Sequence, residues 1–180
     1  DSNTIYSSYQ NGAIFRSIDG GATNVYISPS TSYNFQNNYS MNPLKPKTLY
    51  AAFNNIYRSY NRRATWTAIT SGLYPTSTGG GFLIPVIAAP SDTNTIYVAR
   101  FTELYKTTNG GISWTTLTSA GVLPDAYIRG MAVDPTDANK VWITYTSYLS
   151  HFYTTSNQRV FKTTDGGLTW TNITYTGLPF

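Results

Sequence analysis

Residues 163–170 read Thr163-Thr164-Asp165-Gly166-Gly167-Leu168-Thr169-Trp170, and this stretch recurs along the chain. With the three residues before it, it aligns without gaps to three earlier segments. The aligned segments span residues 14–24, 56–66, 104–114 and 160–170, and their starts are 42, 48 and 56 residues apart. The chain is therefore built from four copies of one unit.

A second repeated element precedes each copy. It is a tetrapeptide with an apolar third residue and an aromatic fourth: Asn3–Tyr6, Lys47–Tyr50, Asn94–Tyr97 and Asn139–Trp142. A turn that contains proline precedes the last three tetrapeptides, and a further apolar run, such as 82–88 or 128–133, precedes the last two turns. The alternation of polar and apolar residues over 169–174 is typical of a strand with one buried face. Each full unit is therefore expected to hold an inner strand A followed by strands B, C and D.

The period of the units indicates the architecture. Periods of roughly 40–50 residues with strand-like content are typical of β-propeller blades rather than of helical repeats. We therefore predict an all-β fold of propeller blades with four antiparallel strands each. The predicted boundaries are 1–28 for a first blade without its inner strand, 29–70, 71–118, and 119–180 for a fourth blade and its link to a next one. A larger propeller is the favoured interpretation, and a self-contained ring of four blades is the alternative.

The repeated stretch resembles the Asp-box of sialidase-like propellers, also called the BNR repeat, in which Ser/Thr-x-Asp-x-Gly-x-Thr/Ser-Trp recurs. The fourth copy is a full match, whereas the third has Asn109 for Asp, the second has Asn61 for Asp and Arg63 for Gly, and the first has Asn24 for Trp. With the tetrapeptide, the layout looks most like the repeats of sortilin-type receptors and xyloglucan hydrolases. The resemblance covers nearly the whole chain. It implies a fold strongly and a function weakly, because this superfamily includes both enzymes and scaffolds.

The chemistry of the box is structural. Glycine supplies the positive φ that a tight hairpin needs, and an Asp or Asn side chain accepts backbone N–H bonds across the turn. The tryptophan is expected to pack between neighbouring sheets. The predicted structural residues are Asp19, Asn61, Asn109, Asp165, Trp66, Trp114 and Trp170. One carboxylate per turn offers too few ligands for calcium, so no metal or cofactor is expected.

The amino-acid composition restricts the cellular compartments and the partners that can be expected. Charged residues make up 11% of the chain, there are 16 tyrosines, and cysteine is absent, which excludes disulfides and thiolate metal sites. This composition favours an exported, extracellular or cell-surface protein. No stretch is apolar enough to predict a membrane span.

The net charge of +4 does not predict nucleic-acid binding. Four cations occupy one repeat position, namely Arg16, Arg58, Lys106 and Lys162. Only Arg62-Arg63 and Lys45 with Lys47 cluster locally. A nucleic-acid surface needs a continuous stripe, so no nucleic-acid partner is expected.

Two acidic residues remain after the box and turn positions and the terminal Asp1 are assigned, and they are Glu103 and Asp125. In propellers of this type the B–C and D–A loops open on one face, where Glu103 and Asp125 are expected to meet. Glycoside hydrolysis needs two carboxylates, so they are the candidate catalytic pair of a hydrolase. Against this, the segment Ala99-Arg100-Phe101-Thr102 stands where the xyloglucan-hydrolase resemblance implies a catalytic Asp.

The longest insertion, 146–159, is the other candidate site. Insertions in repeat proteins map to loops that often bind partners. Its side chains suit sugar stacking or protein anchoring, and the predicted ligand or partner residues are Tyr148, His151, Phe152 and Tyr153, with Tyr74 from an earlier link. The alternative is a loop that buries its own aromatic side chains.

The leading functional hypothesis is a non-catalytic extracellular scaffold or recognition module that binds protein or glycan at the cell surface. The alternative is a glycoside hydrolase propeller of the xyloglucanase or sialidase kind. A third hypothesis is assembly, in which other chain segments or subunits complete the propeller through unpaired strand edges.

Overall fold

The computed structural model describes residues 3–8, 13–29, 39–53, 55–62, 65–70, 85–117, 122–145 and 158–175. These residues form strands and turns only, so no helix among them could cross a membrane. The first sheet holds β1 (Ile5–Ser8), β2 (Ile14–Ser17) and β3 (Val25–Tyr26), and the second holds β4 (Tyr39–Met41), β5 (Leu49–Ala52), β6 (Ile56–Ser59) and β7 (Thr67–Ala68). The third holds β8 (Val86–Ala88), β9 (Ile96–Arg100), β10 (Glu103–Thr107) and β11 (Thr115–Thr116). The fourth holds β12 (Ile128–Val133), β13 (Val141–Tyr145), β14 (Val160–Thr163) and β15 (Thr171–Asn172).

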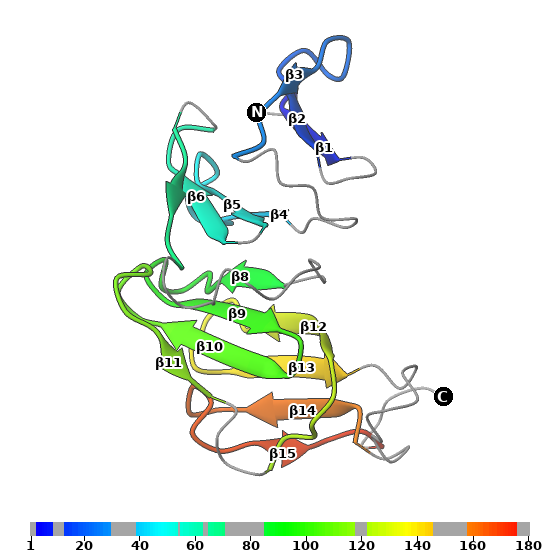
Figure 1. The fold of residues 1–180 in the computed structure, drawn as a ribbon, viewed down its shortest axis with the longest axis vertical. Coiled ribbons are helices and arrows are strands. Elements are labelled where there is room, and N and C mark those ends of the chain that lie inside the picture. The colour runs from blue at the N-terminus through cyan, green and yellow to red at the C-terminus, as the bar shows by residue number, and fades with distance from the viewer. Residues whose placement is uncertain are drawn as a thin grey trace.

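Every sheet is antiparallel, and its strands pair in chain order. The last three sheets have four strands each, which confirms the predicted all-β blades (Figure 1). The described part of the first sheet has three strands. The inner strands β4, β8 and β12 lie together, because β8 contacts both of the others. Successive sheets therefore surround a common side, as propeller blades do.

In the last three sheets the fourth strand is shorter than the alternating pattern suggests. It begins after the tryptophan and spans two residues in β7, β11 and β15. One further backbone bond extends each, for example Leu117 N to Leu104 O at 2.8 Å. The tryptophan itself lies before the paired residues. Its ring turns toward the preceding sheet, and Trp114 Nε1, for example, donates to Ile69 O at 2.8 Å.

Three buried clusters hold the sheets together, one between each successive pair. Strand β5 shows how one strand serves two clusters. Leu49 and Ala51 pack toward the first sheet, whereas Tyr50 and Ala52 pack toward the third. Side chains alternate between the faces of a strand, so a strand buried on both faces needs an unbroken apolar run. The tetrapeptides of the sequence are the starts of these runs.

The repeated cations link neighbouring sheets. Arg16 Nη1 donates to Arg62 O at 3.2 Å, and Arg58 Nη1 donates to Gly110 O. Lys106 Nζ donates to Gly166 O at 3.3 Å. Each acceptor is the carbonyl of the same position in the next sheet's hairpin. Most of the repeated positive charge therefore has a structural role between sheets.

Candidate functional site

The hairpin that leads into the last strand of each sheet is held by one polar side chain. In the first hairpin, Asp19 Oδ1 accepts from Thr23 N at 2.9 Å and from Ser17 Oγ at 2.7 Å. Asn61, Asn109 and Asp165 accept equivalent bonds in the other three. The Thr23 hydroxyl and amide lower the pKa of Asp19 to about 2. These side chains accept hydrogen bonds inside their turns, and in the described hairpins both carboxylates, Asp19 and Asp165, are engaged in this way.

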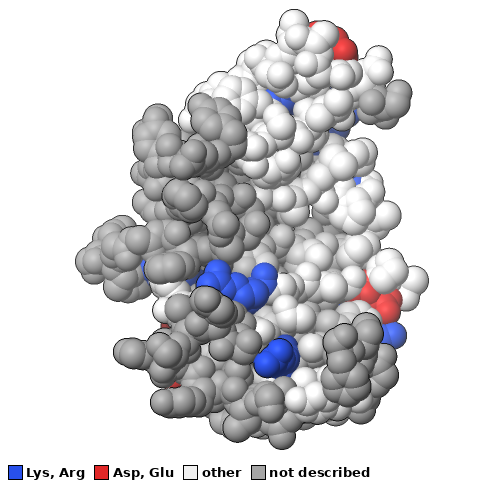
Figure 2. Space-filling model, turned by 90° about the vertical axis from the view of Figure 1, so that its right-hand side faces the viewer, with Lys and Arg blue, Asp and Glu red and all other residues white. Residues whose placement is uncertain are grey.

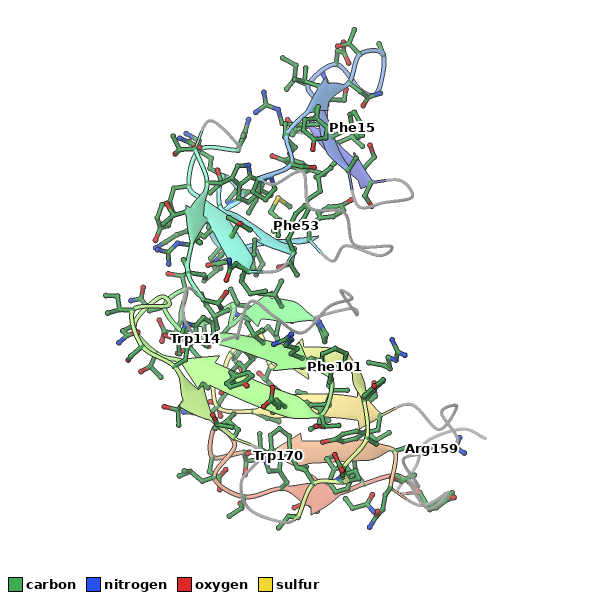
Figure 3. All side chains as sticks on the ribbon, in the orientation of Figure 1. Phe15, Phe53, Phe101, Trp114, Arg159 and Trp170 are labelled. Carbon is green, nitrogen blue, oxygen red and sulfur yellow. The ribbon has the colours of Figure 1, made fainter. Side chains whose placement is uncertain are left out.

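The opposite end of the third sheet carries the candidate site. Strand β10 runs from the β9–β10 turn to its hairpin, so the two features lie at opposite ends of one strand. Figure 3 labels Phe101, in the turn, and Trp114, after the hairpin, at these two ends. The carbonyl of Phe101 accepts from Ile128 N at 2.8 Å, which joins the turn to the segment that leads into β12.

The predicted acidic residues lie on either side of this junction. Asp125 lines a pocket of about 250 Å³ with Thr102, Leu123 and Pro124. Glu103 follows Thr102 and begins β10. The β9–β10 turn and the segment before β12 therefore meet at one end of the sheets, with Glu103 directly after the turn and Asp125 in the segment.

The setting of the two carboxylates differs from that of a catalytic pair. Both side chains are exposed. Glu103 also accepts a hydrogen bond from the Tyr105 side chain, and this bond adds to burial in raising the pKa of the Tyr105 hydroxyl. A glycosidase needs one protonated and one ionised carboxyl group, and burial in a shaped cleft normally keeps the acid protonated. The described residues do not supply such a cleft.

An aromatic and cationic cluster lies beside the pocket. The rings of Phe101 and Tyr127 are 5.4 Å apart between centroids, with an interplanar angle of 49°. The Arg100 guanidinium lies 5.3 Å from the Phe101 ring centroid, and the Arg129 guanidinium lies 5.8 Å from that of Tyr127. Figure 2 faces the side that carries Phe101 in Figure 3 and shows Lys and Arg side chains gathered near its middle. We call Phe101, Tyr127, Arg100 and Arg129 the aromatic cluster.

Phe101 has an unusual backbone. Its φ is 53°, and it is the first residue of a two-residue turn between Arg100 and Glu103, which pair with each other. Glycine is the usual residue at this position of a tight hairpin, because positive φ crowds Cβ. A bulky residue there costs roughly 1–2 kcal/mol. Backbone strain of this kind is often found at binding sites, where the position of a side chain serves function at a cost to the stability of the protein.

Other predicted site residues lie outside the described part of the chain, namely Tyr74, Tyr148, His151, Phe152 and Tyr153. Within the described part, no group of three His, Cys, Asp or Glu residues could hold a metal ion.

The repeat pattern does not predict the aromatic cluster. Positions 99–102 indicate only that a catalytic Asp is absent there, and Tyr127 stands outside the repeated elements. One sequence signal was available. A phenylalanine and a threonine fill a two-residue gap between strand patterns, where Gly or Asn is expected.

Comparisons with known proteins support the fold. No family model matches the sequence. A probable oligoxyloglucan-reducing end-specific xyloglucanase from Neosartorya fischeri is 35% identical over 121 residues, which are 61% of this chain and 15% of that protein. Among solved structures, the GH74 xyloglucanase from Xanthomonas campestris aligns with a TM-score of 0.67 at 18% identity, over 99% of this chain and 30% of that one. YCF48 bound to D1 peptide aligns with a TM-score of 0.58 at 14% identity, over 98% of this chain and 53% of that one.

The chain thus spans a small share of the curated relative and under a third of the xyloglucanase structure. These likenesses establish a propeller architecture, since structural identities this low carry the fold alone.

Proposed function

We propose that this chain is a glycan-recognition segment of a larger secreted β-propeller, and that it binds neutral polysaccharide through the aromatic cluster. The observation that carries the proposal is the pair of partly exposed rings, Phe101 and Tyr127, which pack in a tilted arrangement and are flanked by Arg100 and Arg129. Sugar rings stack on aromatic faces through their C–H groups, while guanidinium groups donate to hydroxyls at the edge.

Three further points support it. The strained φ of Phe101 is explained if the ring is selected for contact rather than for the turn. The pocket beside Asp125 gives a polar acceptor next to the rings. The relative with 35% identity is named for action on xyloglucan, so we choose xyloglucan oligosaccharides as the first ligand class. The repeated hairpins are, in this proposal, Asp-box turns that serve the architecture.

Secretion is part of the proposal. The absence of cysteine and the low share of charged residues, 11%, suit an exported protein. A polysaccharide-binding segment also needs to meet its polymer outside the cell.

The test is titration calorimetry of the protein with xyloglucan oligosaccharides. Phe101→Ala and Tyr127→Ala are expected to weaken binding about tenfold or more, because each removes a central aromatic contact. Tyr26→Ala, which removes a 44% exposed tyrosine from β3, is the matched control and should bind as the unchanged protein does. Unaltered affinity in both cluster variants would show that the site is elsewhere. Tight binding of an unstructured peptide instead of glycan would favour a protein partner.

Phe101→Gly separates a binding role from a structural one. Glycine fits a φ of 53° without strain, so thermal stability should hold or rise while glycan affinity falls. A variant that loses stability and keeps its affinity contradicts the proposed role of Phe101.

Hydrolysis is the second candidate function. It is favoured by the position of Asp125 in a pocket beside the turn that precedes Glu103, together with the name of the curated relative. If the protein releases reducing ends from xyloglucan, and Glu103→Gln and Asp125→Asn each abolish that release, the chain is catalytic. We expect no turnover, because both carboxylates are exposed.

A further inference from the structure

A basic pocket lies at the hairpin end of the second sheet, far along the strands from the aromatic cluster. It measures about 400 Å³, and its lining residues are Lys45, Pro46, Lys47, Thr48, Tyr60 and Arg62. The turn before β5 supplies one wall, and the β6–β7 hairpin supplies the other. The structure therefore brings Lys45 and Lys47 together with Arg62, which lies about 15 residues further along the sequence.

Two of the cations depart from the repeat's own pattern. Position 47 is lysine, whereas the equivalent residue of the other three copies is asparagine, at Asn3, Asn94 and Asn139. Position 62 is arginine, whereas the equivalent residue of the other three hairpins is glycine, at Gly20, Gly110 and Gly166. The second copy has thus acquired a cation at both positions, and these two residues are joined by a bond from Arg62 N to Lys47 O at 2.9 Å.

The arginine occupies a position that favours glycine. The φ of Arg62 is 58°, close to the 69–74° of the three equivalent glycines. A side chain with positive φ is strained, so a hairpin alone does not explain an arginine here.

The two departures share one pocket. A Cβ placed on Gly166 would lie 2.7 Å from Asn139 Oδ1, and one on Gly110 would lie 3.6 Å from Asn94 Oδ1, whereas one on Gly20 meets nothing within 4 Å. The nearest atoms at Gly166 and Gly110 belong to Lys106 and Arg58 of the preceding sheet. The link between Lys47 and Arg62 is therefore that both side chains line the pocket.

The pocket is lined by three cations, Lys45, Lys47 and Arg62, and its lining holds no Asp or Glu. Lys45 Nζ donates to Thr93 Oγ1 at 2.9 Å, and Lys45 contributes to lowering the pKa of Asp92, so this lysine is partly neutralised. The Arg58 guanidinium lies 4.5 Å from the centroid of the Tyr60 ring and adds positive potential at the rim. A pocket with an excess of cationic donors favours an oxyanion.

We propose that this pocket binds the carboxylate or sulfate groups of an acidic polysaccharide. Tyr60 is 61% exposed and stands with Pro46 at the pocket, which gives a sugar ring an apolar surface beside the cations. The cations meet in one pocket rather than along a stripe, so they suit a single anionic group better than the regular phosphates of a nucleic acid. This site is independent of the neutral-glycan site at the other end of the sheets.

The test measures binding of polygalacturonate and of dextran sulfate at low salt by affinity electrophoresis and calorimetry. Lys47→Asn/Arg62→Gly restores the residues of the other copies. We expect it to weaken binding at least tenfold, because charge-assisted bonds are lost, and to leave the melting temperature unchanged or raised. Arg159→Gln is the matched control, since it removes one exposed charge from another part of the chain.

Each outcome decides the proposal. Loss of acidic-polysaccharide binding in the double variant alone supports it, and the two polymers show whether carboxylate or sulfate is preferred. Equal binding by the double variant and the unchanged protein overturns it. An equal loss in Arg159→Gln also overturns it, because net charge is then the cause. Stronger binding of single-stranded DNA than of either polysaccharide, lost in the double variant, assigns the pocket to nucleic acid instead. Xyloglucan oligosaccharide binding should survive in the double variant in every case.

Discussion

Single residues set the tolerance of each hairpin to substitution. In the first, third and fourth hairpins, which are described in full, two consecutive glycines have positive φ. The surroundings of these positions differ. A Cβ on Gly20 meets nothing within 4 Å, whereas a Cβ on Gly111 lies 2.8 Å from Ile69 Cβ and 3.2 Å from Ile69 O. Gly20→Ala is therefore expected to lower the free energy of unfolding by about 1 kcal/mol, from φ strain alone. Gly111→Ala should lower it by about 3 kcal/mol, because overpacking is added. Chemical denaturation of both variants measures the difference, and equal losses would contradict this explanation.

The acid sensitivity of the hairpins also belongs to single residues. The pKa of Asp19 falls from 3.8 to about 2 on folding, because the Thr23 and Ser17 groups donate to its carboxylate. A pKa depressed in the folded state gives stability that is present above the unfolded value and lost as the pH falls from about 4 to 2. Asp19→Asn should leave the melting temperature at pH 7 nearly unchanged, since Asn61 and Asn109 make the same turn. It should flatten the fall in melting temperature below pH 4, and an unchanged acid slope would contradict the assignment.

At the scale of elements, the outer edges of the sheets are connected by the repeated cations. Arg58 is half-buried and donates from β6 to the hairpin of the third sheet. Arg58→Met should lower the free energy of unfolding by about 1–2 kcal/mol, through loss of a hydrogen bond from a charged donor. Arg58→Lys should retain most of the stability, because Lys106 makes the equivalent link in the next sheet. Denaturant titration of the two variants tests this order, and equal destabilisation would show that the guanidinium shape is essential.

At the scale of the whole molecule, the sheets form a series in which each contacts its neighbours. In the first sheet β1 and β3 are mostly exposed and only the two end residues of β2 are buried, whereas four of the five residues of β9 are buried on both faces. Stability in repeat arrays is distributed by such nearest-neighbour contacts. Backbone amides of β1 and β2 are therefore expected to exchange with solvent at a lower opening free energy than those of β9 and β10. Native-state hydrogen exchange measures this, and uniform protection across all four sheets would indicate a single cooperative unit.

The sequence by itself determined the unit, the strand order and the hairpin chemistry of this protein. These features are local: a tetrapeptide run, a turn with positive φ and an Asp or Asn side chain act within about ten residues. The position of Asp125 near the β9–β10 turn also followed from the order of strands within each unit. The described structure does not test the prediction for the insertion around His151, which lies outside it.

Only the tertiary structure decided which functional side chains from different segments lie close together. It joined Phe101 to Tyr127 across two sheets, and it brought Lys47 and Arg62 to one pocket. It also showed that Arg16, Arg58 and Lys106 link neighbouring sheets instead of forming a charged surface. The physical reason is that contacts between sheets depend on the packing of two faces and on turn geometry. A one-dimensional period fixes which side chains share a face, but it does not fix which neighbouring turn they touch.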